Sequence, residues 1–389
     1  MNKNRIGQLD AMRGLAAIAV IFSHYYLVEV KPALSDLLFK FSPLGFIKNG
    51  HGAVILFFLL SGFVLMLPFL KNSAFSYRTF LLKRILRIYV PFWFAMVFSI
   101  LLSSWLSTGG IPALSTWFNS SWNEPTTVKS VVENLLLIGN YNSNLYNNVI
   151  WSLVQEMRIS IIFPLLALII MKWNWKTVLG LCLALSAISG TKNIFGYDHS
   201  YGFHTGFVDT LHYATIFLIG GLLAKHREFI VGLFVKSSKA WKWSLLGLAY
   251  ILFTYSELAM AVGNRIGLRD YQEILDDYTT AASCVILIVI ALGSARVTKL
   301  LSVRIIAFFG DISYSLYLYH LLVLFSFIYL LYGKLPLAII YVLAFIWTIL
   351  IAAASYNYIE APAIKWGKRI GKRSNKGAHQ PSEPVAKLN

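Results

Sequence analysis

The chain has 389 residues, of which 57 % are hydrophobic and only 13 % are charged, whereas soluble globular proteins carry about 25 % charged residues. Lys and Arg together number 34 against 17 Asp and Glu, which gives a net charge of +17. This composition excludes a disordered chain, a secreted disulfide scaffold and a typical soluble enzyme, and it favours an all-α, polytopic membrane protein. The two cysteines, Cys182 and Cys284, form no CxxC pair, which excludes a zinc finger or a dithiol redox motif.

Apolar runs long enough to cross a bilayer occur along most of the chain. A membrane-spanning helix needs about 20 mostly apolar residues, and the sequence predicts ten such helices, of which the fifth is the shortest. No internal repeat and no second soluble domain separates them. The ten predicted spans lie near residues 9–28, 50–70, 86–107, 151–172, 176–190, 209–225, 243–262, 278–296, 309–332 and 336–357.

The basic residues indicate how the spans are oriented. With the N-terminus in the cytoplasm, 25 of the Lys and Arg residues fall in cytoplasmic segments and 8 in outer segments, as the positive-inside rule requires. We therefore expect both termini in the cytoplasm, with residues 363–389 as a basic, disordered tail. Lys3 and Arg5 before an apolar run are also typical of a cleaved signal peptide. However, the run continues into His24-Tyr25-Tyr26 without a small-residue cleavage site, which favours an uncleaved first span.

The first span carries polar residues where lipid is expected. Asp10, Arg13 and His24 share one helical face, and small residues beside them allow another helix to approach closely. At a rise of about 1.5 Å per residue, His24 lies roughly 16 Å deeper than Arg13. An imidazole near the middle of the bilayer is typical of a functional site. The same position is equally compatible with a structural histidine that bonds to a neighbouring helix.

The segment that leads into the third span is basic. Lys83, Arg84 and Arg87 lie three and four residues apart and share one helical edge. A cytoplasmic basic edge is typical of an anchor to anionic membrane lipid. Arg side chains also match the geometry of phosphate groups, so the same edge is a candidate phosphate site. The spacing alone favours the lipid anchor.

Polar groups recur in the fourth and ninth spans. The fourth opens with Trp151-Ser152 and continues to Glu156 and Arg158, whose side chains lie about 200° apart on a helix and cannot easily pair with each other. Each needs a partner elsewhere or a water-filled cavity, so Glu156 is either a functional carboxylate or one half of an ion pair between helices. In the ninth span Tyr317 and His320 align at helical spacing, which indicates bonding between helices or, less directly, a substrate lining.

Taken in chain order, these pieces resemble the membrane acyltransferase family often called acyltransferase 3, which includes bacterial O-acetylases of surface polysaccharides. Each motif alone is weak, but together the motifs cover residues 8–362. We therefore predict one acyltransferase 3-like transmembrane domain, residues 1–362. The matching motifs are Leu9-Asp10 with Arg13-Gly14, His24, Phe57-Phe58 through Ser61-Gly62-Phe63, Arg84-x-x-Arg87-Ile88, Trp151-Ser152-Leu153-x-x-Glu156, Phe163-Pro164, Phe217-Leu218-Ile219-Gly220, Ser313-Tyr314-Ser315-Leu316-Tyr317 with His320, and Glu360-x-Pro362.

The resemblance implies transfer of an acyl group, usually acetyl, from cytoplasmic acyl-CoA to a hydroxyl of a glycan or lipid-linked sugar at the membrane. His24 matches the essential histidine of the family, and Arg84 and Arg87 match its RxxR pair. The sequence departs from the family where Met157-Arg158 follow Glu156, because many members carry a second acid there. The fused extracytoplasmic hydrolase-like domain of some members is not in this sequence, so a partner enzyme outside the cytoplasm is a candidate to complete the transfer.

The resemblance and the residue patterns together describe an expected site without a metal or a permanently bound cofactor. Arg84 and Arg87, helped by Arg13 or a neighbouring lysine, are expected to bind the phosphates of acyl-CoA, the donor co-substrate. His24 is expected to act as a general base on the acceptor or, less directly, as a transient acyl carrier. Glu156 is expected to orient His24 or to bind the acceptor. The remaining expected substrate contacts are Asp10, Trp151, Ser152, Tyr317 and His320.

Residues 108–149 form a long outer segment rich in Asn, Ser and Thr. Its aromatic residues Trp117, Trp122, Tyr141 and Tyr146 are typical of sugar binding and equally of anchoring at the membrane interface. The segment is therefore predicted either to form part of an acceptor mouth or to lie along the interface.

A transporter or flippase for an anionic or sugar substrate is the main alternative, since buried His and Glu residues with a basic entrance would also serve transport. The motifs favour the enzyme. Acylation of an amine instead of a hydroxyl is a further alternative. We expect a multi-pass protein of the bacterial inner membrane, and we expect no nucleic-acid partner because the basic residues follow the membrane topology.

Overall fold

The computed structural model describes residues 6–30, 43–71 and 76–377 of the chain, with side chains as far as Ile370. It is 81 % helical, and the described residues form no β-strand beyond an isolated bridge between Tyr332 and Leu335. Lys3 and Arg5, and the end of the predicted tail at residues 378–389, lie outside the described residues.

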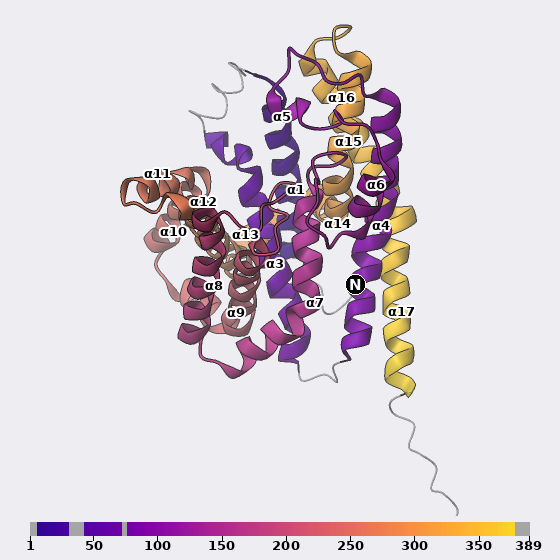
Figure 1. The fold of residues 1–389 in the computed structure, drawn as a ribbon. Coiled ribbons are helices and arrows are strands. Elements are labelled where there is room, and N and C mark those ends of the chain that lie inside the picture. Colours follow the sequence, from indigo (N-terminus) through magenta and orange to yellow (C-terminus); the bar gives the residue numbers. More distant parts are fainter. Residues whose placement is uncertain (1–5, 31–42, 72–75, 378–389) are drawn as a thin grey trace, which may run out of the picture.

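The chain folds into a bundle of long helices joined by shorter ones (Figure 1). In chain order the elements are α1 (Gly7–Val28), η1 (Pro43–Lys48), α3 (Gly50–Leu70), α4 (Tyr77–Leu106), α5 (Thr116–Asn119), α6 (Val128–Leu136), α7 (Ile150–Lys172), α8 (Trp175–Phe195), α9 (Asp209–Lys236), α10 (Lys239–Thr254), α11 (Glu257–Arg265), η2 (Arg269–Tyr271), α12 (Gln272–Gly293), α13 (Ala295–Leu301), α14 (Arg304–Asp311), α15 (Ser313–Leu331), α16 (Leu337–Ser355), η3 (Tyr356–Glu360) and α17 (Ala361–Gly377). Asn49 and Ser76 cap the starts of α3 and α4, because their side-chain oxygens accept from first-turn N–H groups.

Within the described residues, eight helices are long and apolar enough to cross a membrane, and α10 with α11 forms a ninth candidate that is bent by 69°. These candidates correspond to nine of the ten predicted spans. The predicted sixth span, residues 209–225, is helical as part of α9, but Asp209 and Lys225 make it less apolar and it is not among the candidates. The all-α membrane fold is confirmed. The count of ten spans and the cytoplasmic position of both termini stay predictions.

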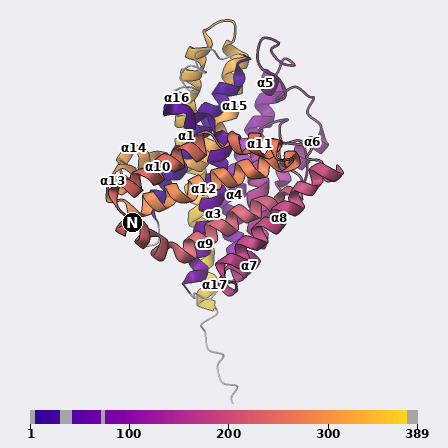
Figure 2. The same ribbon diagram turned by 90° about the vertical axis from the view of Figure 1, so that its left-hand side faces the viewer.

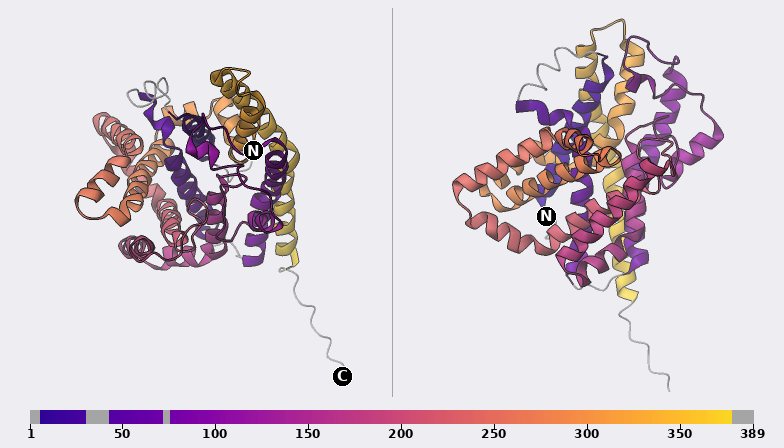
Figure 3. Two further views of the ribbon diagram at one scale, coloured as in Figure 1. Left: turned by 45° about the horizontal axis from the view of Figure 1, so that its top comes forward. Right: turned by 60° about the vertical axis from the view of Figure 1, so that its left-hand side comes forward.

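The helices form two groups around a common centre. In Figure 1, α1, α3, α7 and α15 lie in the middle, with α4, α16 and α17 on one side and α8 to α12 on the other. Figure 2 brings the second group to the front and shows these helices running obliquely to the central ones. The segment with α5 lies at one end of the molecule beside the turn between α15 and α16, and α17 extends toward the opposite end (Figure 3). We call these the α5 end and the α17 end.

Glycine residues allow α3 and α9 to approach at backbone distance. A Cβ atom added to Gly62 of α3 would lie 2.2 Å from the carbonyl oxygen of Phe217, and one added to Gly220 of α9 would lie 2.1 Å from the carbonyl oxygen of Leu59. Both separations are far below van der Waals contact, so only glycine fits at these positions. Close approach of this kind is how helices associate in a membrane, where burial of apolar surface supplies little driving force.

The last helices form one continuous element that the sequence did not predict. α16 passes through the π-helical turn η3 directly into α17. A π turn inserts an extra residue into the helical ladder and changes which side chains face inward. The expected disorder of residues 363–389 is therefore wrong for the first part of that range, because residues 363–377 continue α17.

Candidate active site

A cavity of about 580 Å³ extends between the central helices and α17. Apolar side chains of α3 form much of its wall, and the charged residues on the wall include more cations than acids. The cations on the wall are Arg13, Lys83, Arg84, Arg87, Lys365 and Lys368, and the acids are Asp10, Glu156, Asp311 and Glu360. A concave site with an apolar passage and clustered positive charge suits a long molecule with an anionic end.

Arg84 is fixed inside the cavity wall by α7. Its Nη2 donates to the Glu156 carboxylate at 2.6 Å and to the Ser160 hydroxyl at 3.0 Å. Ser61 of α3 donates to the same Glu156 oxygen at 3.2 Å. Arg84 is only 8 % exposed, and a buried ion pair leaves a costly uncompensated charge if either partner is lost. Glu156 thus has its partners at Arg84 and Ser61, not at His24.

The other two arginines predicted for donor binding differ from each other. Arg13 donates through Nη1 to Asp10 at 3.1 Å and through Nη2 to the carbonyl oxygen of Leu60 at 3.3 Å. Arg87 lines the cavity and forms no ion pair with any of the described residues. Within the RxxR pair, therefore, the charge of Arg84 is neutralised by the Glu156 carboxylate, while the charge of Arg87 is available to a ligand.

A layer of side chains closes the cavity on the side away from α17. Tyr317 donates to the carbonyl oxygen of Val149 at 2.9 Å, and its hydroxyl lies 2.6 Å from that of Ser152. The ring of Phe57 packs edge-on against Tyr317 at 5.7 Å. All three side chains of this layer, Phe57, Ser152 and Tyr317, line the cavity.

His24 and His320 form an imidazole pair just beyond this layer. Nδ1 of His24 lies 2.9 Å from Nε2 of His320, and Nδ1 of His320 lies 3.1 Å and 2.9 Å from the carbonyl oxygens of Leu316 and Tyr317. Because a carbonyl oxygen only accepts, His320 donates through Nδ1, and its Nε2 accepts the Nδ1 proton of His24. Nε2 of the neutral His24 then carries a lone pair and can act as a base.

The imidazole pair lies where α1 meets the segment of α5. The ring of His24 stacks on Trp117 of α5 at 5.3 Å and on His320 at 5.1 Å. The ring of Tyr317 is 6.0 Å from that of His320, whereas neither histidine lines the cavity. One layer of side chains thus separates the cavity from the candidate base.

The structure places the ten predicted site residues in three locations. Seven line the cavity, two form the imidazole pair, and the ring of Trp151 instead stacks on His51 at 5.7 Å. His320 is fully buried, so it contacts His24 and not an open substrate surface. The seven that line the cavity are Asp10, Arg13, Arg84, Arg87, Ser152, Glu156 and Tyr317.

Sequence reasoning missed a buried carboxylate between two histidines. His51 of α3 lies 2.6 Å from one oxygen of Asp277 of α12, and His212 of α9 lies 3.0 Å from the other. His212 also contacts the Ser186 hydroxyl of α8 at 2.8 Å. His51 and Asp277 both border apolar runs in the sequence, but nothing in their spacing indicates that they meet. The cluster ties α3, α9 and α12 together close to Trp151.

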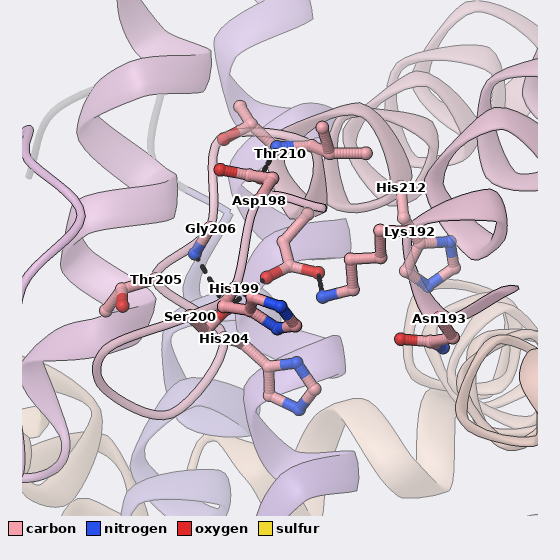
Figure 4. Close-up of polar contacts among 12 residues, drawn as sticks. Lys192, Asn193, Asp198, His199, Ser200, His204, Thr205, Gly206, Thr210 and His212 are labelled. Atoms are coloured by element: carbon pink, nitrogen blue, oxygen red, sulfur yellow. Dashed lines mark hydrogen bonds and ion pairs between the residues drawn. The ribbon is translucent and has the colours of Figure 1, made fainter. Parts of the chain in front are cut away.

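A further polar cluster fixes the loop between α8 and α9 (Figure 4). Asp209 forms an ion pair with Lys192 and accepts from the Ser200 hydroxyl at 2.9 Å. Ser200 in turn accepts from the backbone N–H of Gly206 at 2.9 Å. Arg158 of α7 donates to the carbonyl oxygen of Gly206 at 2.8 Å. As expected, Arg158 does not pair with Glu156. Its partners belong to this loop.

His204 projects from this loop toward α7. Its backbone has a φ of +49°, a left-handed conformation that is uncommon for a residue other than glycine. The ring lies 5.3 Å from that of Trp151 and 5.7 Å from that of His51. Burial, and then the charge of His51, lower the pKa of His204 to about 4. The side chain is therefore neutral at neutral pH and belongs to an aromatic cluster.

The aromatic residues of the outer segment are mostly packed inside the molecule. Trp122 is 2 % exposed, Tyr141 2 % and Tyr146 1 %, so these three rings offer no open face on which a sugar could stack. Trp117 differs because it covers the ring of His24. Of the aromatic residues predicted to form an acceptor mouth, Trp117 is the one that meets the candidate base.

A sequence profile described as an acyltransferase domain matches residues 6–357. The chain belongs to the acyltransferase 3 family. No curated protein and no solved structure matches it. The resemblance drawn from the motifs is thus confirmed: the protein is a multi-pass membrane acyltransferase. The matched region holds the imidazole pair and most of the cavity wall, and it ends before α17.

The acyltransferase holds no group of three or more His, Cys, Asp or Glu placed to bind a metal ion among its described residues. Its cysteines, Cys182 and Cys284, are buried free thiols that lie outside the cavity. The site thus combines the imidazole of His24, whose Nε2 lone pair is available, with a neighbouring cavity that carries positive charge.

Proposed function

We propose that this acyltransferase moves an acyl group, usually acetyl in this family, from cytoplasmic acyl-CoA to a hydroxyl group of a glycan or lipid-linked sugar. One observation carries the proposal: a cation-lined cavity ends one side-chain layer away from an imidazole whose Nε2 lone pair is available. Membership of the family supports acyl transfer. The excess of basic residues in the predicted cytoplasmic segments supports a donor from that side. We place the protein in a bacterial inner membrane because the family includes bacterial O-acetylases of surface polysaccharides.

The cavity suits an acyl-CoA donor, which combines a phosphorylated nucleotide with a long, flexible arm that ends in a thioester. Arg87 and the nearby lysines supply positive charge for the phosphates. The arm would extend along the apolar wall toward Phe57. The hydroxyl groups of Tyr317 and Ser152 lie where the thioester would arrive. Each now donates to the carbonyl oxygen of Val149, so each has to give up that bond before it donates to the carbonyl oxygen of the thioester.

His24 is the proposed general base. Its Nε2 removes the proton of the acceptor hydroxyl as that oxygen attacks the thioester carbonyl. The new ester bond forms, the carbon–sulfur bond breaks, and the imidazolium of His24 gives its proton to the departing CoA thiolate, so that charge and protons balance. For the thioester to reach His24, the layer of Phe57, Ser152 and Tyr317 has to open.

Replacement of His24 tests this role. We expect His24→Gln to lower the rate of acyl transfer by about 100-fold or more, because general-base catalysis typically contributes 10²- to 10⁴-fold. The measurement follows radiolabelled acetyl-CoA incubated with the purified protein and membrane glycolipid, with label in the glycolipid and released CoA as readouts. His199→Gln is the matched control, since His199 is exposed in the loop between α8 and α9. Wild-type transfer by His24→Gln would remove His24 from the mechanism.

The same preparation distinguishes the enzyme from a transporter. An acyltransferase releases CoA in proportion to the acylated product, and an ester product is cleaved by mild alkali whereas an amide is not. Movement of a sugar or anion across proteoliposomes without any transfer of label would contradict the proposed function and support transport.

A further inference from the structure

Helix α17 forms part of the cavity wall although it lies beyond the residues that the family profile matches. Lys365 and Lys368 of α17 line the cavity together with Lys83 and Arg87 of α4, whereas the family profile ends at residue 357. Residues three apart on a helix lie on one face, so the two lysines of α17 point into the same part of the cavity. This helix therefore adds positive charge toward the α17 end.

Packing holds α17 against α4. At Gly367 the two helices are in contact, because an added Cβ would lie at van der Waals distance, 3.5 Å, from Cα of Lys83. At the start of the helix, Ser315 of α15 donates to the Glu360 carboxylate at 2.8 Å. Trp366 faces away from the cavity and is 64 % exposed, as is typical of an aromatic side chain at a membrane interface. The position of the lysines is thus a consequence of tertiary packing.

Four cations gather at this end of the cavity. Lys83, Arg87, Lys365 and Lys368 form no ion pair among the residues that the structure describes. The two deeper arginines of the cavity, in contrast, each bond to a carboxylate. Cations outnumber acids on the cavity wall, and like charges repel one another, so an anionic ligand between these cations lowers their repulsion.

We propose that α17 builds a phosphate-binding subsite in which Lys365 and Lys368, with Lys83 and Arg87, bind the phosphate groups at the nucleotide end of the acyl thioester. The inference rests on the proposed function and extends it to a helix beyond the residues that the family profile matches. The subsite makes the enzyme select a nucleotide-bearing thioester over the same arm without phosphates.

Two donors that differ in their phosphates test the subsite. Acetyl-CoA and acetyl-pantetheine carry the same thioester arm, but only acetyl-CoA carries phosphates. We expect Lys365→Ala and Lys368→Ala each to raise the KM for acetyl-CoA about 3- to 10-fold, as for the loss of one charge-assisted contact. The KM for acetyl-pantetheine should stay at the wild-type value. Arg369→Ala is the matched control, because Arg369 is an exposed cation of α17 that does not line the cavity.

Two outcomes would overturn the subsite. An unchanged KM for acetyl-CoA in both lysine variants would show that these charges do not meet the donor. A parallel rise for both donors would show that the substitutions damage the cavity as a whole. If the wild-type protein uses neither donor, the proposed function fails instead, so the two failures can be told apart.

The phosphates of anionic lipid are the other source of the same chemistry. Assays in vesicles of phosphatidylcholine alone and in vesicles that also contain phosphatidylglycerol distinguish them. A donor subsite keeps the effect of the lysine variants on the KM for acetyl-CoA in both vesicles. If the variants weaken only the attachment of the protein to phosphatidylglycerol and leave that KM unchanged, the lysines bind lipid and the proposal is wrong.

Discussion

The two nitrogens of His24 have different tasks. From the sequence, this histidine was equally compatible with a structural bond to another helix and with a functional role. Nδ1 makes the structural bond to His320 of α15, while Nε2 keeps its lone pair. The structural interpretation therefore describes Nδ1, and the functional one stays a proposal for Nε2, whose lone pair follows from the tautomer that the structural bond sets.

In the proposed mechanism His320 positions His24, so its replacement should act on the rate and not on donor binding. We expect His320→Leu, which removes the acceptor for the Nδ1 proton of His24, to lower kcat about 10- to 100-fold with an unchanged KM for acetyl-CoA. His320→Gln retains an amide oxygen that can accept this proton, and it should restore much of the loss. Thermal stability in detergent serves as the control for folding. Equal kcat values for the Leu variant and the wild type would contradict the positioning role.

The two arginines of the RxxR motif also have different tasks. Arg84 is buried in a network with Glu156 and Ser160, which ties α4 to α7. Arg87, one turn further along α4, faces the cavity without a carboxylate partner among the described residues. The spacing correctly indicated that both lie on one helical edge. It could not show which of them is neutralised, because Glu156 is 72 residues away in the sequence.

At the scale of the element, the sequence predicted where helices occur better than it predicted the residues at which they begin and end. Apolar runs mark the spans because the bilayer sets their length. The start of α4 at Tyr77 and the continuation of α16 into α17 were missed, since polar and basic residues continue both helices beyond the apolar runs. Such extensions depend on caps and on packing against neighbouring helices, which hydropathy does not measure.

The close contact of α3 with α9 leads to a prediction about stability. Gly62→Ala places a Cβ atom 2.2 Å from the carbonyl oxygen of Phe217, so we expect a loss of about 1–3 kcal/mol in the free energy of unfolding. Gly180→Ala in α8 is the control, because nothing lies within 4 Å of the added Cβ and alanine has the better helix propensity. Unfolding in mixed micelles measures both. A Gly62→Ala protein as stable as wild type would mean that the two helices can separate without cost.

At the scale of the whole molecule, the site combines groups from opposite ends. The cations of the cavity lie toward α17, and the imidazole pair lies against the α5 segment, with the layer of Phe57, Ser152 and Tyr317 between them. The motifs predicted membership of the family and seven of the residues that line the cavity. They could not predict the His51–Asp277 contact, whose partners are 226 residues apart, because only the packed bundle brings such residues together.

The central claim is that the donor binds on the side of α17 and that His24 receives the acceptor on the side of α5. Sealed membrane vesicles of the two opposite orientations, supplied externally with radiolabelled acetyl-CoA, which does not cross the bilayer, test it most directly. We predict that label reaches membrane glycolipid only when the donor meets the face that carries α17, which we expect to be cytoplasmic, and that His24→Gln abolishes the transfer. Transfer from donor supplied only to the opposite face, or transfer that persists without His24, would contradict the account.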